Sequence, residues 1–190
     1  MIRLGVLGST RGTDLQAILD AIQNHTLDAE VVVVVSNRNK SYILERARHH
    51  NIPDVFVSQK GKTRDGFDRE ITATLLQHRA DLVLLIGFMR ILSAEFCQKW
   101  HDRILNVHPS LLPKYAGGMD NDIHEEVLRN GDVETGCTIH FVTEEVDAGP
   151  ILIKKKCTVA GKDTVESLKT KVQQLEGMAF IEAIKMIANK

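Results

Sequence analysis

The feature that most constrains this chain is a set of short, fully apolar runs separated by segments with helical periodicity. One run contains five consecutive valines, Val31–Val35, and another covers Leu82–Ile86. A strand that is apolar on both faces belongs inside a parallel sheet that helices cover on both sides. Between the runs, apolar residues recur at the three- and four-residue spacing of a helix face, as from Leu15 to Ile22.

Strands and helices alternate through the first two thirds of the sequence. We expect strands at Arg3–Gly8, Glu30–Ser36, Asp54–Val57, Leu82–Ile86 and Ile104–Val107. Helices are expected around Leu15–Ile22, at Ile43–His50 and at Arg64–His78. This order predicts an α/β protein, with an open, mostly parallel sheet between two layers of helices.

The last third of the sequence has a different pattern. Thr138–Val142 and Ile151–Val159 alternate apolar and polar residues, and the turn Asp147–Pro150 joins them. They predict strands that close onto the sheet, some of them antiparallel. Asp163–Glu166 has the form of a capping box, and a long C-terminal helix is expected after it. We expect residues 1–190 to form a single domain.

Charge and cysteine content limit the partners of this chain. Its 24 lysines and arginines balance 25 aspartates and glutamates, so no basic excess exists to hold nucleic acid. Three cysteines without a CxxC pair make neither a disulfide framework nor a zinc knuckle, and favour a reducing compartment. No apolar run reaches the roughly 20 residues of a membrane span, and the start does not resemble a signal peptide. We expect a cytoplasmic monomer or homodimer that binds small molecules.

The segments that follow the predicted strands are candidates for a binding site, because ligands of open parallel sheets bind beyond the carboxyl ends of the strands. Three such segments are Gly8–Asp14, Gly87–Leu92 and His108–Ser110, and we expect them to converge on one edge. The least regular stretch is Pro109–Asp122, which contains two prolines and two glycines. Long loops of this kind are often functional.

The first of these loops is rich in glycine and hydroxyl groups and opens a helix. Free amides and the helix dipole there suit a phosphate. A plain tight turn, with Thr13 as the helix cap and Gln16 as its partner, explains the same residues. Asp14 stabilises the helix but repels a bound phosphate. Both interpretations of the loop stay open on the residues alone.

Asn106 and His108 lie two residues apart at a predicted strand end, which places both side chains on one face. An amide donor beside a histidine suits the charge that develops on a carbonyl oxygen during acyl transfer, and histidine moves protons near neutral pH. A purely structural histidine remains the alternative. Asp147 is either a turn residue or, if its turn folds back, a carboxylate that orients His108 and raises its pKa.

Covalent and metal-dependent chemistry lack a motif in this sequence. Ser110 has no GxSxG context, the cysteines lie in ordinary apolar or strand segments, and no histidines have metal-binding spacing. Direct group transfer without a covalent intermediate or a metal is therefore the expected chemistry.

The run NVHPSLLPKYAG, from Asn106 to Gly117, resembles the signature of the folate-dependent formyltransferases. Residues Gly8–Ala17 are similar to the phosphate loop of the members that act on a ribonucleotide. Other blocks match the family in order and spacing, namely Ser36–Asn37, Glu45–Ala47, Gly87–Leu92, Gly136–Val142 and Val146–Ile151. The resemblance covers nearly the whole chain and implies the formyltransferase fold, with a long C-terminal helix.

The resemblance also implies roles for particular residues. The catalytic trio would be Asn106, His108 and Asp147. The phosphate of the ribonucleotide would bind at Gly12, Thr13 and Asp14, and its glycinamide end would meet Glu176. The folate would contact Arg64, the segment Met89, Arg90, Ile91 and Leu92, Asn106, and the loop Glu144–Asp147.

The implied reaction is direct attack by the amine of 5'-phosphoribosylglycinamide on 10-formyltetrahydrofolate, a co-substrate, in de novo purine biosynthesis. Many members have asparagine at the position of Asp14, and only His124 matches the last histidine of the family's His-Thr-His run. These departures leave open another acceptor, such as an amino-sugar nucleotide. A binding module without catalysis is the non-enzyme alternative, and the intact trio argues against it.

Overall fold

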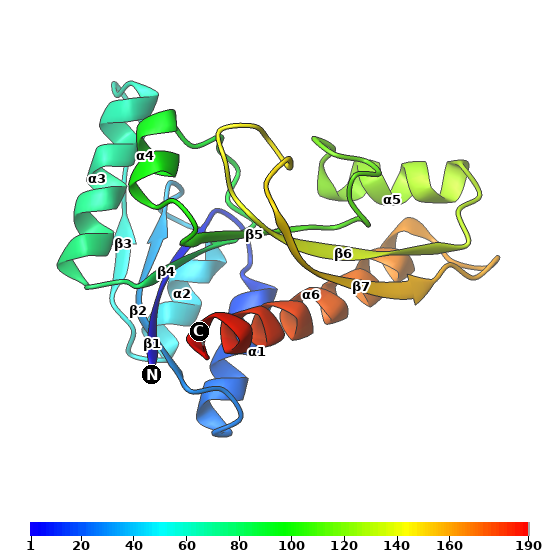
Figure 1. The fold of residues 1–190 in the computed structure, drawn as a ribbon, viewed down its shortest axis with the longest axis horizontal. Coiled ribbons are helices and arrows are strands. Elements are labelled where there is room, and N and C mark those ends of the chain that lie inside the picture. The colour runs from blue at the N-terminus through cyan, green and yellow to red at the C-terminus, as the bar shows by residue number, and fades with distance from the viewer. Residues whose placement is uncertain (190) are drawn as a thin grey trace.

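The computed structural model describes residues 1–189, which are organised around one seven-stranded sheet (Figure 1). The strands are β1 (Ile2–Gly8), β2 (Ala29–Ser36), β3 (Asp54–Phe56), β4 (Leu82–Ile86), β5 (Ile104–His108), β6 (Glu134–Phe141) and β7 (Ile151–Thr158). Their order across the sheet is β3-β2-β1-β4-β5-β6-β7. Strands β1 to β5 pair in parallel, whereas β6 and β7 are antiparallel. The predicted α/β class and mixed sheet are confirmed.

Helices cover both faces of the sheet (Figure 1). They are α1 (Thr13–Gln23), α2 (Tyr42–His49), α3 (Arg64–Gln77), α4 (Ala94–Lys99), α5 (Asp120–Arg129) and α6 (Val165–Ala188). Apolar residues of α1, α2 and α6 pack on one face, and those of α3 and α4 on the other. Leu84 of β4 points into the first core and its neighbour Leu85 into the second. A strand between two apolar layers must be apolar throughout, as the sequence predicted.

Two helices were missed by the sequence reading. Helix α4 is short, and Ser93 caps it by accepting a hydrogen bond from the Phe96 amide at 3.2 Å. Helix α5 begins inside the stretch expected to be irregular and has no side-chain cap. It is held by tertiary packing, because its apolar residues Ile123 and Val127 share a small core with Leu168 of α6. A helix with so few buried apolar residues is not readily predicted from the hydrophobic periodicity of the sequence.

Both predicted helix starts are wrong in detail. The N-cap of α6 is Thr164, and Ser167 completes the capping box. The N-cap of α1 is Gly12, which has a φ of 67°, so Thr13 is the first helical residue and no side chain caps this helix. A Cβ atom at position 12 would lie 2.5 Å from Ile43 of α2, which explains glycine there. The first turn of α1 is therefore open at its amide end.

No helix within residues 1–189 is long and apolar enough to cross a membrane.

Candidate functional site

Ser9 ties together the loops that follow β1, β2 and β4. Its backbone N–H donates to Gly87 O at 3.0 Å, and its hydroxyl donates to Asn37 Oδ1 at 2.6 Å. The same hydroxyl accepts a hydrogen bond from the Met89 amide at 3.0 Å. The predicted convergence of Gly8–Asp14 and Gly87–Leu92 at one edge of the sheet is therefore confirmed.

The predicted trio meets at the end of β5. His108 Nδ1 lies 3.2 Å from Asp147 Oδ2, because the turn between β6 and β7 folds back over the sheet edge. Asn106 Nδ2 lies 3.1 Å from Nε2 of His140, its direct partner in the β5–β6 ladder. An amide nitrogen has two hydrogens, so Asn106 keeps one for a ligand.

His140 is a member of this cluster that the sequence reading did not assign. It is 2% exposed, its Nδ1 donates to Phe141 O at 2.9 Å, and its Nε2 lies 3.4 Å from Asp147 Oδ1. Asp147 is thus held between two histidines. The only signal for this role is the antiparallel register that places His140 opposite Asn106, and the sequence does not encode that register locally.

The pKa of His108 is set by two opposing influences, its partners and its burial. Both ring nitrogens face acceptor oxygens, Asp147 Oδ2 and the Tyr115 carbonyl, and only the imidazolium donates to both. Burial nevertheless dominates, and it lowers the pKa of His108 below its ordinary value despite Asp147 and Tyr115. Asp147 thus raises the pKa of His108, as expected, but the net shift is downward because burial outweighs it.

Asp147 itself is ionised. Burial raises the pKa of this carboxyl, but the neighbouring ring of His140, the Gly117 amide and the ring of His108 together outweigh burial and lower it. The Gly117 N–H donates to Asp147 Oδ2 at 2.8 Å. A stable carboxylate beside a neutral imidazole is an arrangement that stabilises any further proton arriving on the ring.

The loop after β5 occupies the reactive face of His108. Tyr115, at a φ of 59°, directs its carbonyl oxygen to within 2.8 Å of His108 Nε2. The Tyr115 hydroxyl donates to Asp132 at 2.9 Å, which anchors the loop to the end of α5. A substrate that is to reach Nε2 must displace this carbonyl.

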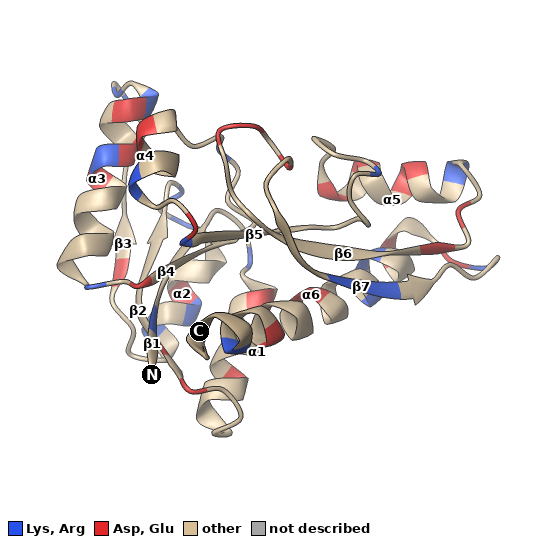
Figure 2. Cartoon of the chain, in the orientation of Figure 1, with Lys and Arg blue, Asp and Glu red and all other residues tan. Residues whose placement is uncertain are grey.

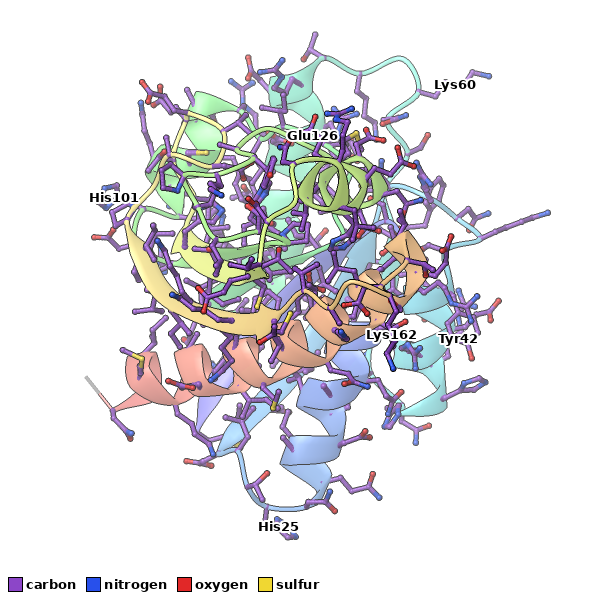
Figure 3. All side chains as sticks on the ribbon, turned by 90° about the vertical axis from the view of Figure 1, so that its right-hand side faces the viewer. His25, Tyr42, Lys60, His101, Glu126 and Lys162 are labelled. Carbon is purple, nitrogen blue, oxygen red and sulfur yellow. The ribbon has the colours of Figure 1, made fainter. Side chains whose placement is uncertain are left out.

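The open end of α1 forms the second part of the site. Gly12 caps the helix, Thr13 is exposed and Asp14 is buried. Tyr42 lies at the surface nearby (labelled in Figure 3), with the guanidinium of Arg11 5.4 Å and that of Arg46 5.0 Å from its ring centre. Free helix amides beside two guanidinium groups suit an anion.

The predicted carboxylate Glu176 lies on α6, next to the point where α6 crosses α1. A Cβ atom on Gly177 would come within 2.6 Å of Ala17 Cβ, so the two helices approach closely there. Asp14 and Glu176 are 5% and 8% exposed. The structure thus brings Asp14 and Glu176 to the same helix crossing, although they are far apart in sequence.

The predicted folate residues are spread over two environments. Met89 and Ile91 are exposed in the loop that Ser9 holds by hydrogen bonds, whereas Leu92 is buried in the core under α3 and α4. The guanidinium of Arg90 lies 4.3 Å from the centre of the Phe67 ring. Arg64 is exposed at the start of α3, and among the described residues no hydrogen bond or ion pair joins it to the trio. Its role in folate binding stays a prediction.

Charged residues of both signs lie on the surface of the molecule. Figure 2 shows blue and red residues interspersed along α3, whereas α5 carries red residues and turns blue only at its C-terminal end. Within residues 1–189, no three histidine, cysteine or acidic side chains converge in a way that could hold a metal ion.

The family model described as formyl transferase matches residues 2–184. The chain is 42% identical to the trifunctional purine biosynthetic protein adenosine-3 of Chironomus tentans, over 98% of this chain but 14% of that protein. It is 38% identical to phosphoribosylglycinamide formyltransferase of Escherichia coli, over 97% of this chain and 86% of that protein. The crystal structure of glycinamide ribonucleotide transformylase 1 from Symbiobacterium toebii superposes with a TM-score of 0.94, at 38% identity, and covers 100% of this chain and 88% of that one.

Proposed function

Because the chain belongs to the formyl transferase family, we propose that it transfers the formyl group of 10-formyltetrahydrofolate to the amine of 5'-phosphoribosylglycinamide, in purine biosynthesis. The observation that carries the proposal is the convergence of Asn106, His108 and Asp147 at the end of β5, on the same edge of the parallel sheet as the open end of α1. The names of the relatives that match nearly the whole chain support this acceptor over an amino-sugar nucleotide.

The proposed reaction is a direct displacement at the formyl carbon. The substrate amine forms the new C–N bond while the formyl oxygen takes up negative charge, and the bond to folate N10 then breaks. The free hydrogen on Asn106 Nδ2 and the N–H of His108 Nε2 donate to that oxygen. The proton lost by the amine passes to the departing folate nitrogen, with His108 as the carrier.

The surroundings of His108 favour protonation of its ring only when negative charge develops on the formyl oxygen. Burial keeps the ring neutral in the free protein, whereas Asp147 stands ready 3.2 Å from Nδ1. A negative oxygen beside Nε2 raises the pKa of the ring, since an opposite charge within a few ångströms favours the imidazolium. The proton is therefore held most tightly where the transition state needs it.

The partners and the compartment of the protein follow from the same proposal. We infer that it acts on small molecules, a folate and a phosphorylated amine. Its three cysteines are free, with Cys97 and Cys137 buried, which supports a reducing compartment such as the cytoplasm.

The experiment is a turnover assay of the purified protein with 10-formyltetrahydrofolate, following the release of tetrahydrofolate. Release that depends on 5'-phosphoribosylglycinamide supports the proposal. Release without any acceptor indicates hydrolysis, and release only with an amino-sugar nucleotide indicates the alternative acceptor. Either of these two results overturns the proposed acceptor.

A further inference from the structure

Two buried carboxyl groups lie at the crossing of α1 and α6, at the edge of the proposed ribonucleotide site. Asp14 is in the first turn of α1 and Glu176 is one residue before the close approach at Gly177. Both are more than nine-tenths buried, and Asp14 Oδ1 has no hydrogen-bond partner among the described residues. A buried carboxylate oxygen without a donor is costly, so this pair requires a proton or a ligand.

The cationic groups nearest to the pair are already engaged by another carboxylate. Lys169 of α6 forms an ion pair with Asp120 of α5, and its Nζ donates to Asn121 Oδ1 at 3.0 Å. The buried ring of His124 has its Nε2 3.5 Å from Asp120 Oδ1. Lys169 and His124 thus lie against Asp120 and do not pair with Asp14 or Glu176, so the helix crossing keeps an excess of acidic groups.

A phosphate bound at the start of α1, as expected, would add further negative charge close to these two carboxyl groups. No side chain caps α1, so its first-turn amides are available to an anion. Asp14 belongs to that same turn. A dianionic phosphate and an ionised Asp14 in the same helical turn would repel each other, whereas a protonated carboxyl can donate a hydrogen bond to a phosphate oxygen.

We propose that Asp14 itself carries a proton in the ribonucleotide complex, so that it binds the phosphate as a hydrogen-bond donor and substrate binding is coupled to proton uptake. The inference rests on the proposed function, because it assigns the phosphate of the substrate to the open end of α1. It makes Asp14 a specificity-determining residue for a phosphorylated acceptor.

The electrostatic surroundings of the pair favour the protonated form. Burial, and then the charge of Asp120, raise the pKa of Asp14 to about 7. Burial, followed by Asp14 and Asp120, raises the pKa of Glu176, and Lys169 lowers it only in part. The thiol of Cys137 on β6 also faces both carboxyls, and burial together with their charges raises its pKa, so it stays neutral.

The protonation of Asp14 sets the pH dependence of phosphate binding. Below pH 7 the proton is already present and phosphate binding needs no further uptake. Above pH 7 the carboxyl of the free protein is ionised, so each binding event must take a proton from solution. The affinity for a sugar phosphate therefore falls as the pH rises above 7.

The test is calorimetric binding of ribose 5-phosphate to the full chain between pH 7 and pH 9, in buffers of different ionisation enthalpy. This probe has no amine, and its phosphate is already dianionic because its second pKa is about 6. We expect the dissociation constant to rise by about tenfold or more over this range, with uptake of close to one proton per site at pH 8. The variant Asp14→Asn keeps a donor but cannot ionise, so its dissociation constant should change by less than about twofold.

The matched control is Asp20→Asn, an exposed carboxyl on the same helix, which should behave as the wild type. Thermal unfolding of each variant checks that it is folded. Binding of ribose 5-phosphate by the wild type without proton uptake would overturn the inference, as would an unchanged pH dependence in Asp14→Asn. Turnover with 5'-phosphoribosylglycinamide would still stand in both cases, so failure of this inference is distinct from failure of the proposed function.

Discussion

At the scale of single residues, the site combines two kinds of buried titratable group. His108 is shielded by burial so that its pKa lies below the ordinary value, and Asp147 is held ionised beside it. Asp14 is the reverse case, a carboxyl that burial and a nearby carboxylate push toward the neutral form. Environments that move pKa values apart in this way are typical of acid–base sites.

Replacing His108 with alanine removes one of the two proposed oxyanion donors and the proton carrier. We expect the variant to lose about 10²–10³-fold in kcat, the usual cost of one such donor, and to keep its fold. Steady-state kinetics measure the loss, and the far-ultraviolet circular dichroism spectrum checks the fold. Near-normal turnover in His108→Ala would contradict the proposed mechanism.

Replacing Asp147 with asparagine tests the electrostatic link to His108. Asp147 raises the pKa of the ring, so its removal lowers that pKa further. Since less imidazolium then forms at any given pH, kcat should fall, and the limb of the pH–rate profile that reports His108 should move to lower pH. A profile of unchanged position would show that the carboxylate acts on something other than the ring.

At the scale of elements, the site depends on two contacts between segments that are distant in sequence. The β5–β6 ladder sets His140 opposite Asn106, and the β6–β7 turn then returns Asp147 to the end of β5. The crossing of α1 and α6 joins Asp14 to Glu176, and it needs a glycine at position 177. Each contact depends on how two elements are placed relative to each other. A small shift of one strand or helix would therefore separate the side chains of the site.

Substituting Gly177 with alanine tests the close helix crossing. The added methyl would lie 2.6 Å from Ala17 Cβ, so the helices must separate. We expect a loss of about 1–3 kcal/mol in the free energy of unfolding, which outweighs the better helix propensity of alanine. Chemical denaturation measures it, and Gly161→Ala, with open space around position 161, is the control that should change little. Equal stability of the two variants would contradict the tight crossing.

At the scale of the whole molecule, the buried carboxyl of Asp14, in the proposed substrate site, lowers the stability of the folded protein. Asp14 ordinarily has a pKa of 3.8, and in the folded protein that value is about 7. Between these values the folded state binds more protons than the unfolded chain, so stability falls as the pH rises from about 4 to about 7.

The variant Asp14→Asn should remove this cost. We expect its free energy of unfolding to exceed that of the wild type by more than about 1 kcal/mol at pH 8, with the difference vanishing toward pH 4. Urea denaturation across this pH range measures the effect, with Asp20→Asn as the exposed control. A wild-type advantage at pH 8 would mean that an ionised Asp14 stabilises the fold.

The sequence by itself determined the layer order and most of the elements, because apolar periods and strand composition are local properties of a chain. It also indicated Asn106 and His108, since their spacing along one strand fixes a shared face. The start of α1, the short helices α4 and α5, and the role of His140 depended on tertiary structure, because packing and strand register override weak local signals. The same holds for the charge of His108 and of Asp14, since burial is created by residues from other elements, and only the folded molecule decides how much water each group retains.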